Sequence, residues 1–345
     1  MKDFLFWSMR TINGGSRVPG ILRAASVLAA TIIIFTGVLS PSLSRAKDDY
    51  PSKPITILVG FAVGGGADTA ARIQGETLSK LLGVPIVVRN VPGAGGRNAV
   101  TLLNRAKPDG YTMATLNVPG QIVNQVVRNL PPDLRTFTWI GRQVSQLYFT
   151  QASKKYPWTS LKDMKKAKNP IRAGTTGTGG NNFPISAMAT DLVGYPVRYV
   201  PGFKAPELIT AIIRGDIEIT TMPLLRPYVA AIESGDARPI ALYGPERHPL
   251  WPNIPTAEEQ GFPELADETY VGQNLYAFPP GTPTKFVHVI EAALVKVNQD
   301  KETLKNLEHT GNLARPLSAE GSVKMIQAMF KLVEKNRSLL KRYIK

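Results

Sequence analysis

Short apolar runs alternate with amphipathic stretches along the part of the chain that follows residue 50. Residues 55–60 form an apolar, β-branched run typical of a strand, and residues 68–82 carry apolar positions at helical spacing before Gly83, which favours a helix end. The alternation continues with a strand at 85–88, a helix at 97–106 and a strand at 111–116. This βαβαβ order predicts a parallel sheet whose crossovers are right-handed and whose loops after each strand lie along one edge.

A second set of α/β elements follows the apolar stretch 138–150, which could carry the chain from one lobe to another. Strands are predicted at 171–174, 197–200, 217–221 and 239–243, and helices at 184–192, 205–214 and 226–233. A short strand near 275–278 precedes helices that continue to the last residues, and we expect it to return the chain to the first lobe.

The predicted fold class is therefore α/β, with two lobes joined by a two-crossing hinge. Lobe 1 comprises residues 47–148 and 276–345, and lobe 2 comprises residues 149–275. Both lobes are of ordinary domain size. Two lobes on a hinge enclose a cleft, and open α/β sheets bind ligands outside the carboxyl ends of their strands.

Residues 1–46 have the three-part organisation of a secretory signal peptide. Basic residues precede an uncharged apolar run at 24–39, and Ser44-Arg45-Ala46 offers small residues at the −3 and −1 positions. An uncleaved membrane anchor is the alternative, but this run is shorter than the ~20 residues that a spanning helix needs. We expect cleavage after Ala46 and a periplasmic protein.

The amino-acid composition excludes several kinds of site and partner. The sequence contains no cysteine, which excludes disulfides, iron–sulfur clusters, a Cys nucleophile and anchoring through a lipidated Cys. The net charge is +15, but the basic residues are scattered and no nucleic-acid-binding motif accompanies them. We interpret them as a solvated basic surface that attracts anionic solutes, and we expect no nucleic-acid partner.

Two glycine-rich loops are the strongest candidates for a binding site. Residues 61–69 connect a predicted strand to a helix, where Asp68 is placed to cap the helix and Thr69 adds a hydroxyl. Residues 173–184 repeat this arrangement in lobe 2, with Asn182 or Phe183 as the predicted cap. Helix N-termini with free N–H groups suit an anion, so we expect the two loops to face each other and to hold a carboxylate. The alternative is a pair of structural turns.

Two further loops lie on the same predicted rim. Residues 90–97 add an N–H-rich turn in which Arg97 is either a cation at the cleft or an exposed helix residue, and Asn117 follows the third strand. Catalytic arrangements are sparse. His248, His288 and His309 are far from the loops in sequence, and neither a metal-ligand spacing nor a G-x-S-x-G motif occurs. The sequence predicts binding without catalysis, and no metal or cofactor.

The loops belong to a longer series of short motifs. The series comprises KPITILV at 53–59, GGGAD at 64–68, NVPGAGG at 90–96, PDGYT at 108–112, GTTGTGG at 174–180, VPGFKAP at 200–206, RGD at 214–216, IPT at 254–256 and PGTP at 280–283. In this order and spacing the chain resembles the substrate-binding proteins of tripartite tricarboxylate transporters, also called Bug proteins. The resemblance covers nearly all of the chain after the predicted leader.

This resemblance implies a type II periplasmic binding protein fold that closes on a small organic carboxylate. It also implies a membrane permease of one large and one small subunit as partner, and a monomer suits a protein that must dock on such a permease. Family roles carried over by position fall on Phe61, Ala67, Asp68, Thr69, Gly177, Thr178, Gly179 and Asn182.

Three positions depart from the family pattern. Met222 stands where the family often has an acidic residue, Gln273 where it often has Trp, and Arg97 where it often has Asn. Without a carboxylate at Met222, a ligand amino group lacks a partner, which disfavours amino acids. Met222 with Phe203 and Phe61 favours an aromatic or otherwise apolar carboxylate over citrate, although Met222 could equally be lobe core.

Two other function classes remain open from sequence. The closed protein could dock on a sensor kinase instead of a transporter, which the sequence does not distinguish. A periplasmic hydrolase or isomerase would need a nucleophile and base paired in the cleft, and no such pair is evident.

Overall fold

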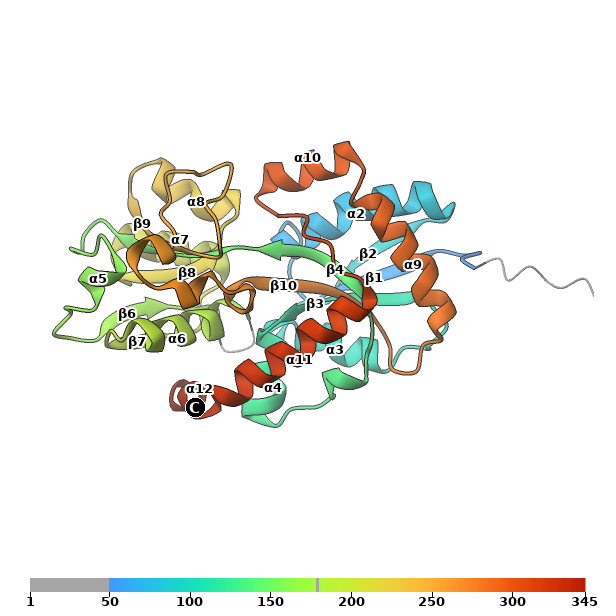
Figure 1. The fold of residues 1–345 in the computed structure, drawn as a ribbon, viewed down its shortest axis with the longest axis horizontal. Coiled ribbons are helices and arrows are strands. Elements are labelled where there is room, and N and C mark those ends of the chain that lie inside the picture. The colour runs from blue at the N-terminus through green and yellow to red at the C-terminus, as the bar shows by residue number, and fades with distance from the viewer. Residues whose placement is uncertain (1–49, 178–179, 345) are drawn as a thin grey trace, which may run out of the picture. The chain divides into compact units, whose positions relative to one another are not determined.

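The structure is a computed structural model that describes residues 50–177 and 180–344 (Figure 1). Its strands form two five-stranded sheets. Sheet A has the order β2 (Ile86–Asn90), β1 (Ile55–Val59), β3 (Thr112–Val118), β10 (Gly272–Phe278) and β4 (Thr138–Gln146). Sheet B has the order β7 (Val197–Val200), β6 (Ile171–Gly174), β8 (Ile219–Pro223), β5 (Tyr148–Ser153) and β9 (Ala237–Tyr243). The predicted two-lobed α/β fold is confirmed.

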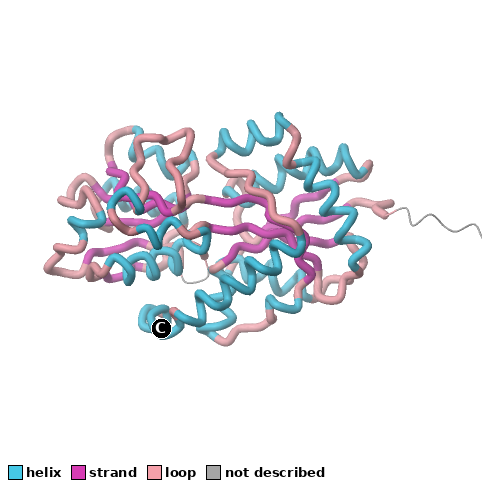
Figure 2. The backbone as a smooth tube through the Cα atoms, viewed as in Figure 1, coloured by secondary structure: helices cyan, strands magenta, loops and turns pink. Residues whose placement is uncertain are grey.

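Helices flank both sheets (Figure 2). In chain order they are α2 (Gly66–Leu82), α3 (Arg97–Asn104), α4 (Gly120–Arg128), α5 (Leu161–Met164), α6 (Asn182–Val193), α7 (Ala205–Arg214), α8 (Arg226–Glu233), α9 (Thr284–Val297), α10 (Lys301–Thr310), α11 (Ala319–Lys335) and α12 (Arg337–Tyr343). Short 3₁₀ turns occur at η1 (Ala94–Gly96), η2 (Leu134–Thr136), η3 (Glu258–Gln260), η4 (Pro263–Ala266) and η5 (Glu268–Tyr270). None of the helices in the described part of the chain is long and apolar enough to cross a membrane.

The chain crosses between the sheets at two places. The stretch 138–150 is not one strand but two, because β4 belongs to sheet A, β5 belongs to sheet B, and only Leu147 separates them. Strand β10 returns the chain to sheet A, as predicted, and begins at Gly272. The lobe boundaries at 148 and 275 remain a prediction, since the strands alone do not assign the connecting segments.

Strand direction decides which loops face each other. Strand β3 is antiparallel to β10, with Val118 opposite Gln273 near the start of β10, and β1 and β2 are parallel to β3. In sheet B, Pro223 at the end of β8 lies opposite Tyr148 at the start of β5, and β6 and β7 run parallel to β8. The carboxyl ends of both parallel sets therefore point at the crossover between the lobes.

Helix α4 is an element that the sequence pattern does not predict. It is short and begins at Gly120, within the sequence Val118-Pro119-Gly120, whose composition is typical of a turn. Its apolar residues Val123 and Val127 are buried in a core cluster that also contains Phe183 and Met188 of α6. The apolar core is therefore continuous between the lobes on this side.

The last helix also contributes to that core. Leu339 and Leu340 of α12 are buried in the same cluster, and α12 contacts both α4 and α6. The ring of Tyr343 lies edge-on to the ring of Tyr199, with centroids 5.0 Å apart. The C-terminal residues thus pack against sheet B helices as well as lobe 1.

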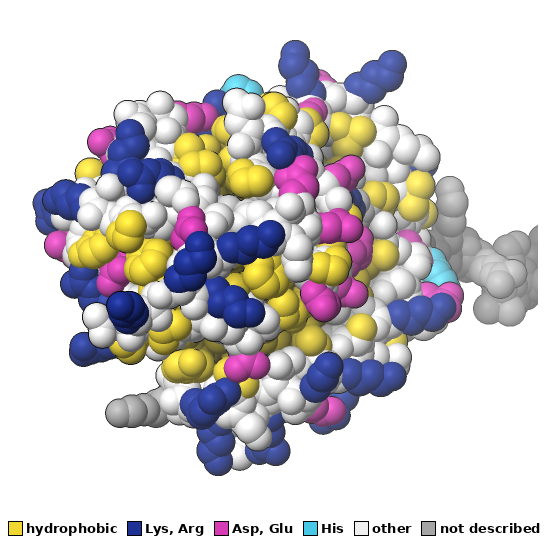
Figure 3. Space-filling view, turned by 60° about the vertical axis from the view of Figure 1, so that its left-hand side comes forward, with side chains coloured by type: hydrophobic (Ala, Val, Ile, Leu, Met, Phe, Trp, Pro, Cys, Tyr) yellow, Lys and Arg dark blue, Asp and Glu magenta, His cyan; other side chains and the backbone are white. Residues whose placement is uncertain are grey.

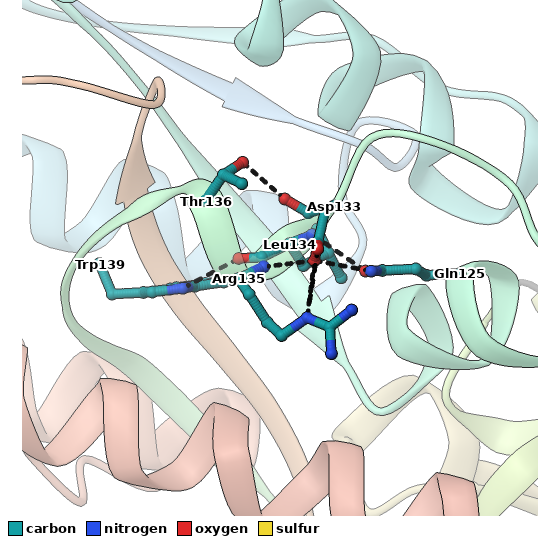
Figure 4. Close-up of polar contacts among 6 residues, drawn as sticks. All are labelled: Gln125, Asp133, Leu134, Arg135, Thr136 and Trp139. Carbon is teal, nitrogen blue, oxygen red and sulfur yellow. Dashed lines mark hydrogen bonds and ion pairs between the residues drawn. The ribbon is translucent and has the colours of Figure 1, made fainter.

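A polar corner fixes the connection between α4 and β4 (Figure 4). Asp133 is the N-cap of η2, and its carboxylate accepts hydrogen bonds from the Arg135 backbone N–H at 2.9 Å and from the Gln125 amide at 2.6 Å. The Trp139 indole donates to the Leu134 carbonyl at 3.2 Å. Burial raises the pKa of the Asp133 carboxyl, but hydrogen bonds from Arg135 and Gln125 outweigh this and lower it overall.

Basic side chains are dispersed over the face shown in Figure 3 rather than gathered into one patch. Several basic residues of the described chain are paired with carboxylates, such as Arg247 with Glu259 at 2.8 Å. This distribution agrees with the interpretation of the net positive charge as a solvated surface.

Candidate ligand-binding site

The loop between β1 and α2 is held by a polar network around Asp68. The carboxylate accepts from the Gly64 N–H at 2.9 Å, from Arg72 Nε at 3.1 Å and from Asn90 Nδ2 at 2.9 Å. Burial raises the pKa of this carboxyl, but these hydrogen bonds and the Arg72 charge lower it overall. The expectation that Asp68 caps α2 is wrong in detail, because Gly65 is the N-cap and Asp68 lies in the first turn. The Asp68 carboxylate therefore holds the loop in place, and its negative charge is already paired with Arg72.

The next two loops of lobe 1 pack directly against this one. Asn90 also donates to the Phe61 carbonyl at 3.0 Å. Gly96 has a φ of +95°, and a Cβ there would lie 3.0 Å from Asn117 Oδ1 and 3.4 Å from the Phe61 ring. Only glycine fits this close approach with that backbone conformation. The structure thus places Phe61 and Asn117 on either side of Gly96.

Arg97 is half-buried at the start of α3. Its guanidinium donates to the Pro131 carbonyl through Nε at 3.4 Å and through an Nη atom at 3.2 Å. It therefore secures the connection after α4.

The lobe 2 loop carries a second set of hydroxyl and amide groups. Thr176 Oγ1 donates to Asn182 Oδ1 at 2.8 Å, and the Gly177 N–H donates to Thr175 Oγ1 at 3.2 Å. The N-cap of α6 is Asn181, so the prediction of Asn182 or Phe183 at the cap is wrong. The predicted site residues Thr178 and Gly179 lie outside the described residues.

Asn181 joins the lobe 2 loop to lobe 1. Its Oδ1 accepts from the Gly120 N–H at 2.8 Å and from Asn117 Nδ2 at 3.3 Å, and Gln121 Nε2 donates to Asn117 Oδ1 at 3.2 Å. We call Asn117, Gln121, Asn181 and Asn182 the amide cluster. All four are buried, although they are polar and uncharged.

Sequence reasoning missed two members of this cluster. Gln121 lies four residues after Asn117, a spacing that has meaning only once α4 is known to be a helix. Asn181 lies within a candidate loop, but the sequence pattern favours Asn182 or Phe183 as the cap. No local signal indicated that its side chain would cross to the other lobe.

A cavity of about 490 Å³ lies where the first loop of lobe 1 meets α8 and the end of α10. Its lining comprises Gly64, Gly66, Thr69, Leu225, Arg226, Pro227, Tyr228, Ala230, Glu233, His309, Thr310 and Asn312. The volume lies in the range of small-molecule pockets. A Cβ on Gly66 would meet Leu225 Cδ1 at 2.5 Å, which shows how closely the lobes approach at its edge.

The histidines are less uniform than their sequence positions suggest. His309 is exposed and lines this cavity together with Gly64 and Thr69, although it is far from both residues in sequence. His288 is exposed, whereas His248 is fully buried against Trp251, with ring centroids 5.0 Å apart. Burial lowers the pKa of His248.

The remaining predicted residues have structural partners. The Ala67 carbonyl accepts from Gln143 Nε2 at 3.0 Å, and the half-buried Phe203 packs against the core of sheet B. Met222 is 1% exposed in that core, with its sulfur 4.0 Å from Asn182 Nδ2. Met222 is therefore a core residue that contacts the Asn182 side chain.

Apart from the Asp68–Arg72 ion pair, the hydrogen-bonding side chains described in these loops are uncharged. No group of three or more His, Cys, Asp or Glu side chains that could hold a metal occurs among residues 50–177 and 180–344. Where the lobes meet, the Gly120 N–H and the Asn117 carboxamide contact the Asn181 carboxamide. Such groups stabilise an anion without transferring a proton to it.

Solved structures place this architecture in the periplasmic binding protein class. A protein described as a periplasmic transporter is 28% identical, and its TM-score is 0.74 with 86% of this chain and 99% of that chain covered. MatC from Rhodopseudomonas palustris, solved with bound malate, is 22% identical with a TM-score of 0.73, over 84% of this chain and 100% of that chain. The predicted fold class is confirmed.

The family is equally clear. Residues 70–342 match the family described as the tripartite tricarboxylate transporter family receptor. The protein BugT of Bordetella pertussis is 26% identical over 289 residues, which cover 81% of this chain and 86% of BugT. The chain belongs to the tripartite tricarboxylate transporter receptor family. It is therefore a member of a family of periplasmic solute-binding proteins and not an enzyme, as predicted.

Proposed function

We propose that the protein captures a small organic carboxylate between the facing loops of its two lobes and presents it to a membrane permease of one large and one small subunit. The observation that carries this proposal is that uncharged hydrogen-bonding groups of the two lobes meet at the carboxyl ends of two parallel strand sets. Relatives of similar fold support it, since MatC was solved with malate and another R. palustris protein with adipate.

The ligand contacts follow from the loops. Residues Phe61, Ala67 and Thr69 with Asn117 form the lobe 1 side, and Gly177 and Asn182 form the lobe 2 side, with Phe203 and Met222 behind them. The backbone N–H groups of these loops, the Thr69 hydroxyl and the Asn182 amide would orient the carboxylate. Each charge-assisted hydrogen bond contributes roughly 1.5–3 kcal/mol.

The ligand class follows from the charges. Among the described residues, the hydrogen bonds of Asn117, Asn181 and Asn182 involve no Lys or Arg side chain. A tricarboxylate would bring three negative charges to a site of neutral donors, at a large desolvation cost. We therefore expect a mono- or dicarboxylate with an apolar body to bind better than citrate.

Export is the remaining part of the proposal. Residues 1–46 lie outside the described residues, and their sequence is the sole support for a cleaved signal peptide. We propose a monomer in the periplasm, released after Ala46. N-terminal sequencing of protein from a periplasmic extract tests this, and a mature start far from Lys47 would contradict it.

A binding screen tests the function. The melting temperature of the purified protein is measured with benzoate, adipate, malate and citrate, and each hit is followed by calorimetric titration. Stabilisation is expected from a mono- or dicarboxylate, because a ligand that binds only the folded state raises its stability.

Thr69→Val removes one hydroxyl from the cavity wall and should weaken binding. Thr101→Val, a half-buried threonine on α3, is the matched control. If none of these acids binds while amines or sugars do, the proposal is wrong.

A further inference from the structure

Asn181 occupies an unusual position for a helix cap. It precedes α6, yet its side chain makes no capping hydrogen bond to that helix. Its side-chain oxygen Oδ1 instead accepts hydrogen bonds from the Gly120 N–H at 2.8 Å and from Asn117 Nδ2 at 3.3 Å, both in lobe 1. An asparagine before a helix usually satisfies the free N–H groups of its own first turn.

The reason lies in the helix that receives the bond. Gly120 is the first residue of α4, and its N–H has no partner within that helix. The N-cap of α4 is Pro119, which has no side-chain acceptor. Asn181 therefore caps α4 from the other lobe, and this cap exists only while the lobes are together.

The surroundings hold the Asn181 side chain ready for this contact. Tyr148 on β5, in the same lobe as Asn181, is buried, and its hydroxyl lies beside the Asn181 side chain. Asn181 and Asn117 are each only 4% exposed. Opening the lobes would break both hydrogen bonds and leave the first N–H of α4 to be solvated.

We propose that Asn181 is an interlobe latch, a positioning residue that biases the two lobes toward the closed state before a ligand arrives. Interactions formed only in one of two conformations shift the equilibrium toward it. The consequence for affinity rests on the proposed function, because a larger closed fraction raises apparent affinity for a ligand that binds the closed state. The bias itself can be measured without any ligand.

The topology indicates where to measure closure. Strands β2 and β7 are the edges farthest from the crossover strands in their sheets, so their separation changes most on opening. Arg89 on β2 and Arg198 on β7 are exposed, and the chain has no native cysteine. Arg89→Cys with Arg198→Cys therefore gives one specifically labelled pair for spin-label or fluorescence distances.

The test compares the labelled protein with Asn181→Ala, Asn181→Asp and Asn104→Ala without ligand. Asn181→Ala should shift the distances toward the open state by about tenfold in the open-to-closed ratio, since two net hydrogen bonds are lost. Asn181→Asp keeps an acceptor oxygen facing the start of α4 and should remain as closed as the parent. Asn104, at the exposed end of α3, is the control for asparagine removal.

Equal distance distributions for the parent and Asn181→Ala would overturn the latch, as would an Asn181→Asp variant as open as Asn181→Ala. Should Asn181→Ala fold poorly, Asn117→Ala provides a second test. It removes the longer interlobe bond and the Gln121–Asn117 bond within lobe 1 but keeps the bond from the Gly120 N–H to Asn181, so it should give a smaller shift in the same direction. If carboxylates fail to bind any variant while the distance shift persists, the proposed function fails and the latch stands.

Discussion

The side-chain amide nitrogen of Asn90 lies 2.9 Å from Asp68 Oδ1 and ties the end of strand β2 to the first turn of helix α2. The same nitrogen donates to the Phe61 carbonyl at 3.0 Å. The glycine-rich loop is therefore held in one conformation by residues that do not need a ligand. Such preorganisation lowers the entropic cost of binding.

Asp68→Asn should destabilise the fold. The Asp68 side chain is 2% exposed and is paired with Arg72 at 2.9 Å. The free energy of unfolding of the variant protein should therefore be lower than that of the parent by about 1–3 kcal/mol at pH 7. The pKa of Asp68 is lowered in the folded state, so its stabilising contribution is present above about pH 4 and is lost as the pH falls through the folded pKa. Urea denaturation at pH 7 and pH 3 measures both effects.

Asp216→Asn is the matched control for that experiment, because Asp216 is exposed. Its stability should equal that of the parent at both pH values. The gap between the parent and Asp68→Asn should narrow in acid. A gap of constant size would show that the charge of Asp68 contributes nothing.

Gly66→Val should hold the lobes apart. A Cβ at Gly66 would lie 2.5 Å from Leu225 Cδ1 of lobe 2 and 2.6 Å from Gln146 Nε2, so a branched side chain must push them away. We expect at least tenfold weaker ligand binding with little loss of stability. Gly65→Ala is the control, since its φ of −73° suits alanine and its nearest contact is 3.3 Å within the same loop. Calorimetry on both variants decides the point, and unchanged affinity for Gly66→Val would contradict it.

Asp133→Ala should loosen the corner after α4. It removes the N-cap of η2 and the partner of Gln125, so a loss of about 1 kcal/mol of stability is expected. Asp133→Asn retains an acceptor and should lose less. Thermal unfolding of the two variants beside the parent measures the difference, and equal losses would mean that the charge alone matters.

Leu340→Ala should be among the most damaging changes near the C-terminus. The side chain is 0% exposed in the core that α4, α6 and α12 share, and truncating a buried leucine costs about 2–5 kcal/mol. The neighbouring exposed Lys341→Ala should change stability by less than about 0.5 kcal/mol. Denaturant unfolding compares them. Near-parental stability of Leu340→Ala would mean that α12 is not part of the folded core.

Local sequence determined much of this protein. Apolar runs of period two or 3.6, with glycines after strands, specified two α/β sets and the loops at their carboxyl ends, since such elements form from neighbouring residues. The ordered motifs through 53–283 also indicated the family. The pattern did not indicate α4, because a short helix that begins at Pro-Gly looks like a turn and is stabilised by packing.

Only the tertiary structure decided which polar groups meet. Asn90 pairs with Asp68, His309 lines a cavity with Gly64, and Asn181 bonds to Gly120, a residue sixty-one positions away. These contacts depend on how the sheets and lobes pack. Burial of apolar surface drives this packing, and it joins residues whatever their separation in the sequence. The sequence around an asparagine is the same whether its side chain caps its own helix or a helix of the opposite lobe. Only the folded structure shows which of the two helices it caps.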